Sequence, residues 1–285
     1  MNSKLKAGMI PYYIDDNDTI KMRIMIRMSR LEQYILNETI RTQKYNKLRS
    51  EIISENEASD ILHNSCKTAL NDYKKGNILY RGVNGYDAYK LTDPSKGSKR
   101  LSAYAKGNFY TMFIENHKMW KGYPQRDVIC TTDKDEGGRR SNDGPFIVFP
   151  YDGFKLGICP ERDIWLSFKK TIGDIKVVKF NKTLASIYDA YKIPIPKDWN
   201  TMVKTLKSFT IKKLQERDIV RNKHYNNFKN VILSFDNIYD FGTKVLDPNT
   251  NGFKISTRIP NDKNKEVWTD SKCLLVKAYK RNNII

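Results

Sequence analysis

The spacing of apolar residues changes several times along the chain, from a strand-like to a helix-like pattern. These changes restrict the fold more than any other feature of the sequence. Short apolar runs rich in β-branched residues, typical of strands, lie within residues 78–158 and return at 266–276. Apolar residues at three- and four-residue steps, typical of helices, mark residues 55–73 and most of 161–235. The sequence therefore predicts an α+β protein.

The helical stretches differ in how clearly their ends are marked. Residues 15–19 suit the start of a helix, although the alternation of apolar residues after Ile20 also fits a strand. A second helix is predicted over 55–73, with Ser54 as its N-cap and Glu57 at capping-box spacing. Residues 104–119 and 201–215 also have helical patterns, the latter with Met202, Leu206 and Phe209 on one face. Residues 241–252 are predicted to be rich in loops.

The predicted strands are short and end at turn residues. They cover residues 78–83, 126–132 and 144–150, and residues 154–158 are predicted to be the hairpin partner of 144–150. Near the C-terminus, residues 266–270 and 273–276 form either two strands or one strand with a bulge.

Positive charge is concentrated in one part of the chain. The formal net charge is +19, and residues 169–229 contribute 15 Lys and Arg against 5 Asp and Glu. Such a segment favours a polyanionic or acidic partner. A lysine-rich solvated surface without a partner is the alternative, because the lysines are spread out and no known RNA- or DNA-binding motif accompanies them.

Several classes of protein are disfavoured by the sequence. The four cysteines and three histidines are scattered, which argues against a zinc ribbon, a disulfide scaffold or another His and Cys metal site. No apolar run is long enough to cross a bilayer, and the short stretch at 9–14 is followed by aspartates rather than a cleavage site. We therefore expect a cytoplasmic protein without a metal or a membrane partner.

Three short pieces carry the candidate chemistry, and each is weak alone. Arg81 lies in the first apolar run, where burying a guanidinium is costly unless it meets an anion such as phosphate. Thr131 and Thr132 end the next strand, where hydroxyls hold a loop, contact a sugar or simply cap the strand. Glu266 opens a C-terminal strand, and its carboxylate suits sugar hydroxyls or a nearby cation.

In this order, the pieces resemble the Arg, Ser-Thr-Ser and Glu-x-Glu pattern of the arginine-type mono-ADP-ribosyltransferases, with bacteriophage members the most similar. The resemblance covers residues 55–276 but depends on few positions. Cys130, Thr131 and Thr132 replace Ser-Thr-Ser, Asn264 replaces the first Glu, and the gap to Glu266 is long. The resemblance implies an N-terminal helical region over 1–76, packed on a central pair of small sheets in a transferase-like domain over 77–285. It also implies a basic helical insertion at about 161–235.

The resemblance also implies a reaction and roles for single residues. NAD would be the substrate, nicotinamide would leave, and ADP-ribose would pass to an acidic or nucleic-acid-associated host macromolecule, in a host cell or from a virion. Arg81 would hold a phosphate or the ribose, while the backbone of Gly82 approaches nicotinamide. Thr131 and Thr132 would support the ribose, and Glu266 would stabilise the cation formed there. Tyr110 or Phe146 would stack on nicotinamide, and Asn264 would face the acceptor.

Two other functions fit parts of the sequence. A non-enzymatic nucleic-acid-binding or host-interaction protein would use Arg81 and the basic segment as a phosphate-binding surface. A cysteine hydrolase would use Cys130 or Cys159 with His117, although no flanking residues resemble a nucleophile elbow.

Overall fold

The computed structural model describes residues 50–96, 108–139, 141, 144–216, 228 and 232–285, and the backbone of 13–14 and 20–21. The chain divides into two compact units, Met1–Asn46 and Lys47–Ile285. In the first unit, the described residues are the antiparallel strands β1 (Tyr13–Ile14) and β2 (Ile20–Lys21). Ile20 thus lies in a strand, and the rest of the helix predicted after residue 15 lies outside the described residues.

The described strands of the second unit form one antiparallel sheet of nine strands, in the order β3-β5-β11-β7-β4-β6-β10-β8-β9. The expected pair of separate small sheets is therefore wrong. The two strands that come last in the sequence are inner strands of this sheet. The bounds are β3 (Ser50–Ile52), β4 (Tyr80–Arg81), β5 (Tyr89–Thr92), β6 (Val128–Thr131), β7 (Phe146–Pro150), β8 (Leu156–Ile158), β9 (Lys254–Ser256), β10 (Glu266–Thr269) and β11 (Cys273–Lys277).

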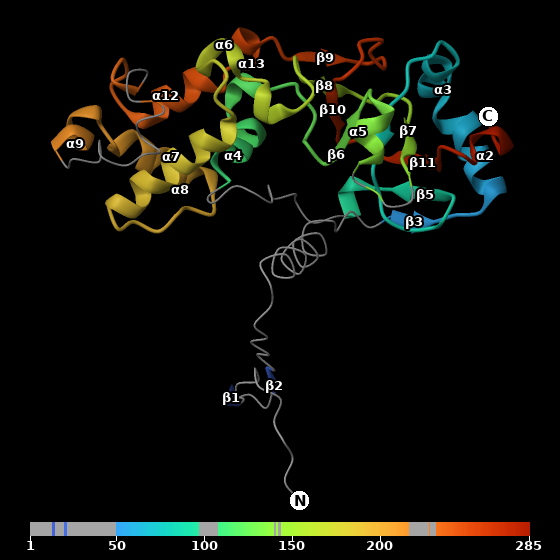
Figure 1. Cartoon of the computed structure of the whole chain (residues 1–285), viewed down its shortest axis with the longest axis horizontal. Helices are drawn as coiled ribbons and strands as arrows, with labels where there is room; N and C mark the ends of the chain where they lie inside the picture. The colour runs from blue at the N-terminus through green and yellow to red at the C-terminus, as the bar shows by residue number, and fades with distance from the viewer. Residues whose placement is uncertain are drawn as a thin grey trace, which may run out of the picture. The chain divides into compact units, whose positions relative to one another are not determined.

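Helices gather at the two ends of the sheet, which confirms the predicted α+β class (Figure 1). At one end lie α2 (Glu55–Ser65) and α3 (Lys67–Lys74). At the other lie α4 (Phe109–Asn116), α6 (Lys169–Ile172), α7 (Val177–Ala190), α8 (Trp199–Ser208), α9 (Ile211–Glu216), α12 (Ile238–Val245) and α13 (Pro248–Asn251). The short α5 (Lys134–Gly138) follows β6, and single 3₁₀ turns occur at η1 (Pro94–Lys96), η2 (Lys118–Trp120), η3 (Ile164–Leu166) and η5 (Arg281–Asn283). No helix among the described residues has the length and apolar character needed to cross a membrane.

Two buried apolar clusters cover different faces of the central strands. One joins the helices around α4, α7 and α12 to Ile129 of β6 and Trp268 of β10. The other joins α2 and α3 to the sheet and takes Cys130 and Val267 from the same two strands. Alternate residues of β6 and β10 therefore enter different clusters, as expected for strands covered on both sides.

A glycine fixes the packing of the inner strand β10. Trp268 is fully buried and lies opposite Gly157 of β8 in the strand register. A Cβ atom at Gly157 would lie 2.2 Å from the indole, closer than any side chain tolerates. The absence of a side chain at this position therefore lets the indole lie flat against β8.

The sequence predicted the start of α2 at its capping residue correctly. It did not predict the features that depend on contacts between distant parts of the chain, such as strand pairing. Ser54 caps α2 and accepts a hydrogen bond from the Glu57 amide at 3.2 Å, as predicted. The helix predicted over 55–73 is broken at Cys66, and that over 201–215 is broken near Phe209. The predicted hairpin of 144–150 with 154–158 is wrong, because β8 pairs with β10 and β9 instead of β7. The loop predicted over 241–252 is also wrong, because α12 and α13 occupy most of it.

The larger unit begins before the predicted domain boundary at residue 76. Helices α2 and α3 belong to the same compact unit as the sheet. Asp152, in the turn after β7, accepts hydrogen bonds from the Lys67 and Thr68 amides at 3.1 and 2.7 Å. Asp152 thus caps α3 from the turn after β7. Cys66, the N-cap residue of α3, makes no side-chain hydrogen bond to the helix.

Candidate functional site

Three neighbouring strands bring the predicted catalytic residues to one part of the sheet. The strands β4, β6 and β10 are adjacent and antiparallel. In their register, Thr131 lies opposite Tyr80 on one side and opposite Glu266 on the other. Arg81 follows Tyr80, so it lies one position away from this row.

The carboxylate of Glu266 is buried and bound by two donors. Glu266 is 5% exposed, and its Oε1 forms an ion pair with Nη2 of Arg126. The amide of Ile164, in η3, donates to the other oxygen at 3.3 Å. Cys159 of the preceding segment donates its amide to the Glu266 carbonyl at 2.9 Å, which holds the start of β10 against the chain that follows β8.

The Arg126 guanidinium sets the electrostatics of this buried region. Arg126 is 8% exposed, and its Nε has no hydrogen-bond partner. Burial alone lowers the pKa of Arg126, but the negative charge of Glu266 outweighs burial and raises that pKa above its ordinary value. Arg126 therefore stays positive inside the protein.

Tyr110 lies on the same side as this ion pair. Tyr110 lies on α4 and is 1% exposed. Its hydroxyl accepts a hydrogen bond from Nε1 of Trp165 at 3.2 Å. Its phenol also contributes to the electrostatic environment of Arg126. The amide of Tyr110 donates to Oδ1 of Asn181 in α7 at 3.0 Å, so the helical layer fixes the position of the ring.

Arg81 and Phe146 lie on the other face of the sheet. They are opposite each other in the register of β4 and β7. Successive residues of a strand point to opposite faces, so Arg81 lies on the face opposite Thr131 and Glu266. Nη1 of Arg81 donates to the Ile129 carbonyl at 2.6 Å. The ring of Phe146 has Nζ of Lys277 at 4.4 Å and Nζ of Lys90 at 5.6 Å from its centroid, which makes this region cationic.

The two threonines hold the ends of neighbouring strands. Oγ1 of Thr131 accepts a hydrogen bond from the Asp133 amide at 3.1 Å, at the start of α5. Oγ1 of Thr132 accepts from the Lys265 amide at 3.0 Å, directly before β10. Asn264 is exposed and has a φ of 59°, a left-handed conformation that Asn adopts more readily than most residues. Asn264 therefore lies on the surface while Glu266, two residues later, is buried.

The structure thus groups the predicted residues in two sets. Thr131, Glu266 and Tyr110 lie with the helical layer, while Arg81 and Phe146 lie on the opposite face, with Gly82 half-buried beyond β4. Sequence reasoning missed Arg126. The signal was present, because Arg126 is the first residue of the strand predicted over 126–132, and a guanidinium buried there needs an anion just as Arg81 does.

The cysteines do not offer a reactive thiol. All four are free and buried. Burial raises the pKa of Cys130 to about 12, although the charge of Arg81 opposes this rise. Burial also raises the pKa of Cys159 far above its usual value. A thiol that stays protonated is a poor nucleophile, so the geometry gives no support to a cysteine hydrolase.

Within the described ranges, no group of three or more His, Cys, Asp and Glu side chains lies close enough to hold a metal ion. No protein-family model, curated protein or solved structure matches the chain. What the protein does is therefore argued from its own residues.

Proposed function

We propose that the chain is a mono-ADP-ribosyltransferase that cleaves NAD and transfers ADP-ribose to a macromolecule. One observation carries the proposal. Arg81, Thr131 and Glu266 are far apart in the sequence, yet they lie on three adjacent strands. Thr131 and Glu266 lie opposite each other on one face, and Arg81 lies on the other face of the neighbouring strand. The resemblance to arginine-type transferases requires these three strands to be neighbours, and chance matches to three short motifs do not. An ADP-ribosyltransferase-like sheet around β4, β6 and β10 is part of the proposal.

Glu266 is the residue that we assign to the bond-breaking step. The bond between ribose and nicotinamide breaks, nicotinamide leaves with its electron pair, and positive charge develops on the ribose. The Glu266 carboxylate, which pairs with Arg126, stabilises that charge and accepts a hydrogen bond from the ribose 2′-hydroxyl. The acceptor then attacks the ribose carbon and loses a proton. Thr131 faces Glu266 across the strand pair and supports the ribose.

The covered state of Glu266 adds a requirement to the proposal. Ile164 binds the carboxylate, and Trp165 next to it binds Tyr110. NAD reaches Glu266 when the η3 segment moves away from β10. Tyr110 lies on this side of the sheet and Phe146 does not, which favours Tyr110 as the ring that stacks on nicotinamide. By the same criterion Arg81 lies across the sheet from Glu266, where it donates to the Ile129 carbonyl, and its assignment to a phosphate of NAD comes from the resemblance alone.

The test measures nicotinamide release from labelled NAD, followed by label transfer to lysate components. We expect Glu266→Gln to reduce nicotinamide release about 10²–10³-fold. The control is Glu51→Gln, a matched change at an exposed residue of edge strand β3, which should release nicotinamide like the unaltered protein. Release at the unaltered rate by Glu266→Gln would refute the proposal.

A second variant guards against misfolding. Arg81 is half-buried, and Arg81→Lys keeps its charge while removing the planar fork. We expect it to weaken NAD binding with an unchanged urea midpoint. Unchanged NAD affinity would remove Arg81 from the site.

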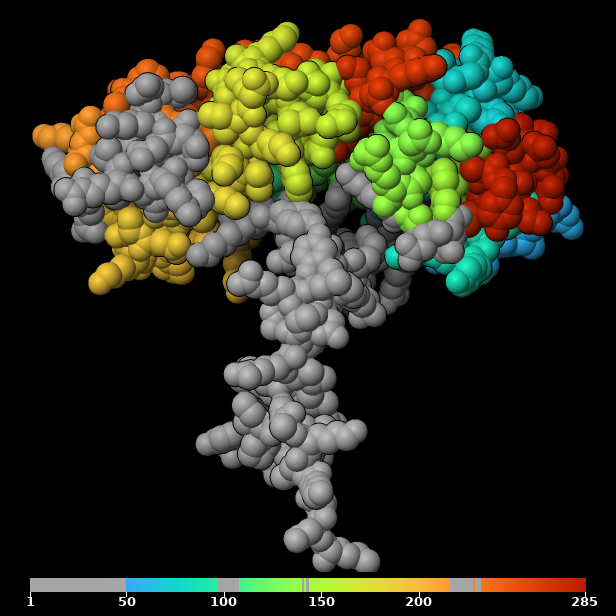
Figure 2. Space-filling model, in the orientation of Figure 1, coloured from blue at the N-terminus to red at the C-terminus, as the bar shows by residue number. Residues whose placement is uncertain are grey.

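A second candidate function, nucleic-acid binding without catalysis, is favoured by one observation. Between residues 169 and 213, eleven lysines are exposed against three exposed acidic residues. The segment that carries these residues is yellow to gold in Figure 2. Reversing Lys204 and Lys207 on α8 separates the two functions. Under the transferase proposal, the reversal impairs acceptor modification more than NAD cleavage, whereas loss of salt-sensitive oligonucleotide binding by a protein that never cleaves NAD favours the second function.

A further inference from the structure

A surface cavity of about 370 Å³ lies beside α5, away from the Arg126–Glu266 pair. Segments distant in the sequence form its walls. Lys134 comes from the first turn of α5, Pro145 from the residue before β7, Ala278 from the residue after β11, and Arg281 and Asn282 from η5. The volume lies within the range of small-molecule sites, which is about 300–1,000 Å³.

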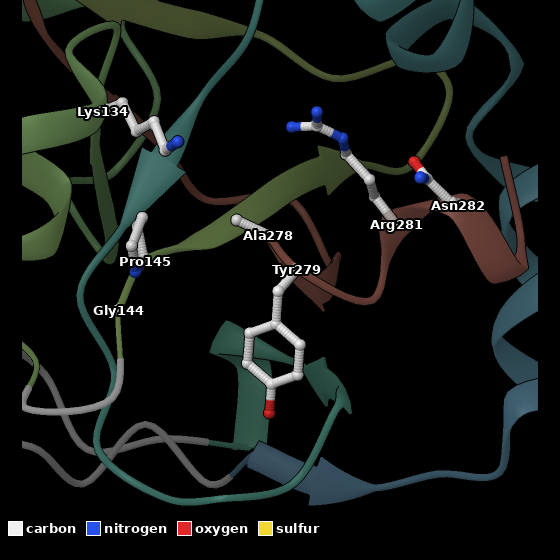
Figure 3. Close-up of a pocket in the computed structure, with 7 residues that line it drawn as sticks. All are labelled: Lys134, Gly144, Pro145, Ala278, Tyr279, Arg281 and Asn282. Carbon is white, nitrogen blue, oxygen red and sulfur yellow. The ribbon is translucent and has the colours of Figure 1, made fainter.

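The cavity has two cationic side chains and no acidic one among its lining residues. Figure 3 shows the charged ends of Lys134 and Arg281 directed toward each other, with Ala278 between them in this view. Within the part of the chain that the structure describes, neither side chain makes a hydrogen bond or an ion pair. The nearest acid in sequence, Asp133, already accepts hydrogen bonds from the Asp135 and Glu136 amides at 2.8 and 3.0 Å.

Two cations that face one cavity repel each other unless an anion lies between them. The guanidinium of Arg281 offers a planar fork for two oxygens of one group, and the ammonium of Lys134 offers a compact point charge. Their combined charge matches that of a phosphate monoester, which is close to −2 at neutral pH. Asn282 adds an amide donor at the same wall.

We propose that this cavity binds the phosphate group of a small phosphorylated ligand. Pro145 and Ala278 form an apolar floor beneath the two cations, so the ligand carries a compact organic part as well as phosphate. The proposal does not depend on NAD cleavage, because none of the residues assigned to that reaction lines the cavity.

The test uses calorimetric titration of the full chain with AMP, pyrophosphate and adenosine. We expect AMP and pyrophosphate to bind with a Kd of about 1 mM or tighter, and adenosine to bind at least tenfold more weakly, because it lacks the phosphate. Arg281→Gln and Lys134→Gln should each weaken AMP binding at least fivefold. Arg281→Lys should weaken it less, because the charge remains.

Lys197→Gln is the matched control, since it removes the same charge from an exposed lysine of the helical region. It should bind AMP like the unaltered protein. Equal AMP affinity in Arg281→Gln and Lys197→Gln would overturn the proposal, and so would no binding of AMP or pyrophosphate up to about 10 mM. Equal binding of adenosine and AMP would overturn it as well. Because Lys134 is exposed and Arg281 half-buried, we expect the variants to keep the urea midpoint of the unaltered protein.

Discussion

Two buried carboxylates in this protein pair with arginine in different ways. The side chain of Asp72, on α3, is 2% exposed, whereas the side chain of its partner Arg258 is 52% exposed. Nε of Arg258 donates to both oxygens of Asp72 at 2.9 and 3.0 Å, Nη2 donates to one of them, and the Ile259 amide adds a further bond at 2.9 Å. Around Glu266, both partners are buried and each oxygen has one donor.

The difference distinguishes a structural fastening from a candidate site. The Asp72 carboxylate is saturated with donors, while half of its arginine stays in water, so the pair joins α3 to the segment before β10 at little cost. The Arg126–Glu266 pair removes two charges from water and leaves Nε of Arg126 without a partner. Such a pair is a poor device for stability, because desolvation offsets most of its attraction. We therefore expect the Arg126–Glu266 pair to contribute little net stability although both of its partners are buried.

The largest expected effect comes from breaking the buried pair. Arg126→Met leaves Glu266 buried and without its guanidinium, so we expect the free energy of unfolding to fall by about 3–5 kcal/mol. Urea unfolding at neutral pH measures this loss.

The double variant Arg126→Met with Glu266→Met provides the control. Replacing both charges by apolar side chains should recover most of the lost stability, because no charge then remains buried. A double variant as unstable as the single one would show that the pair is a structural fastening after all.

A smaller effect is expected at the second pair. Arg258→Met leaves Asp72 with the Ile259 amide, and water enters where the exposed guanidinium lay. We expect a loss of about 1–3 kcal/mol in the same urea experiment. A loss equal to that of Arg126→Met would remove the distinction between the two pairs.

The smallest effect concerns a carboxylate that caps a helix by accepting hydrogen bonds from its backbone amides. Asp152 is exposed and caps α3. Burial alone raises the pKa of Asp152, but the hydrogen bonds from Thr68 and Lys67 outweigh it and lower that pKa below the ordinary value of 3.8. The cap therefore stabilises the fold above about pH 4, and its contribution is lost as the pH falls through the lowered pKa.

Asp152→Asn measures this contribution. At neutral pH the variant should lose about 0.5–1 kcal/mol, the lower part of the range for a cap because the carboxylate is exposed. Near pH 2 its urea midpoint should match that of the unaltered protein. A difference that does not change with pH would mean that charge plays no part in the cap.

Sequence patterns predicted elements better than they predicted partners. The runs that became β6, β7 and β10 are rich in β-branched and aromatic residues, and each forms a strand. The strands that pair with them could not be predicted. The alternation of apolar and polar residues shows which residues share a face of a strand, but not which strand lies beside it. The turn at 151–153 suggested a local hairpin, and the long-range pairing of β8 with β10 prevailed.

Residues that suggested a loop also proved to be helix caps. Asn237 and Asp247 begin α12 and α13, and their side chains accept hydrogen bonds from the Asp240 and Asn249 amides at 3.0 Å. Polar and turn-forming residues mark loops and helix starts alike, so composition alone could not separate the two.

The candidate site was predicted in part. Glu266 was singled out because a carboxylate opens an apolar strand, and Thr131 because hydroxyls close one. Their register, with Thr131 directly opposite Glu266, depends on the complete sheet and has no local signal. The pairing of Arg126 with Glu266 joins residues 140 positions apart, which the sequence of either segment does not reveal.

The place of the late strands has a consequence for biosynthesis. The ribosome produces β10 and β11 after every other strand of the sheet, yet β11 fills the gap between β5 and β7, and β10 the gap between β6 and β8. Until residues 266–277 emerge, the nascent chain carries four strand borders with unpaired backbone groups, which are sites for mispairing with other chains. Emergence of residues 266–277 thus completes the sheet from within, and we expect a chain arrested before residue 266 to be a substrate for chaperones or proteases.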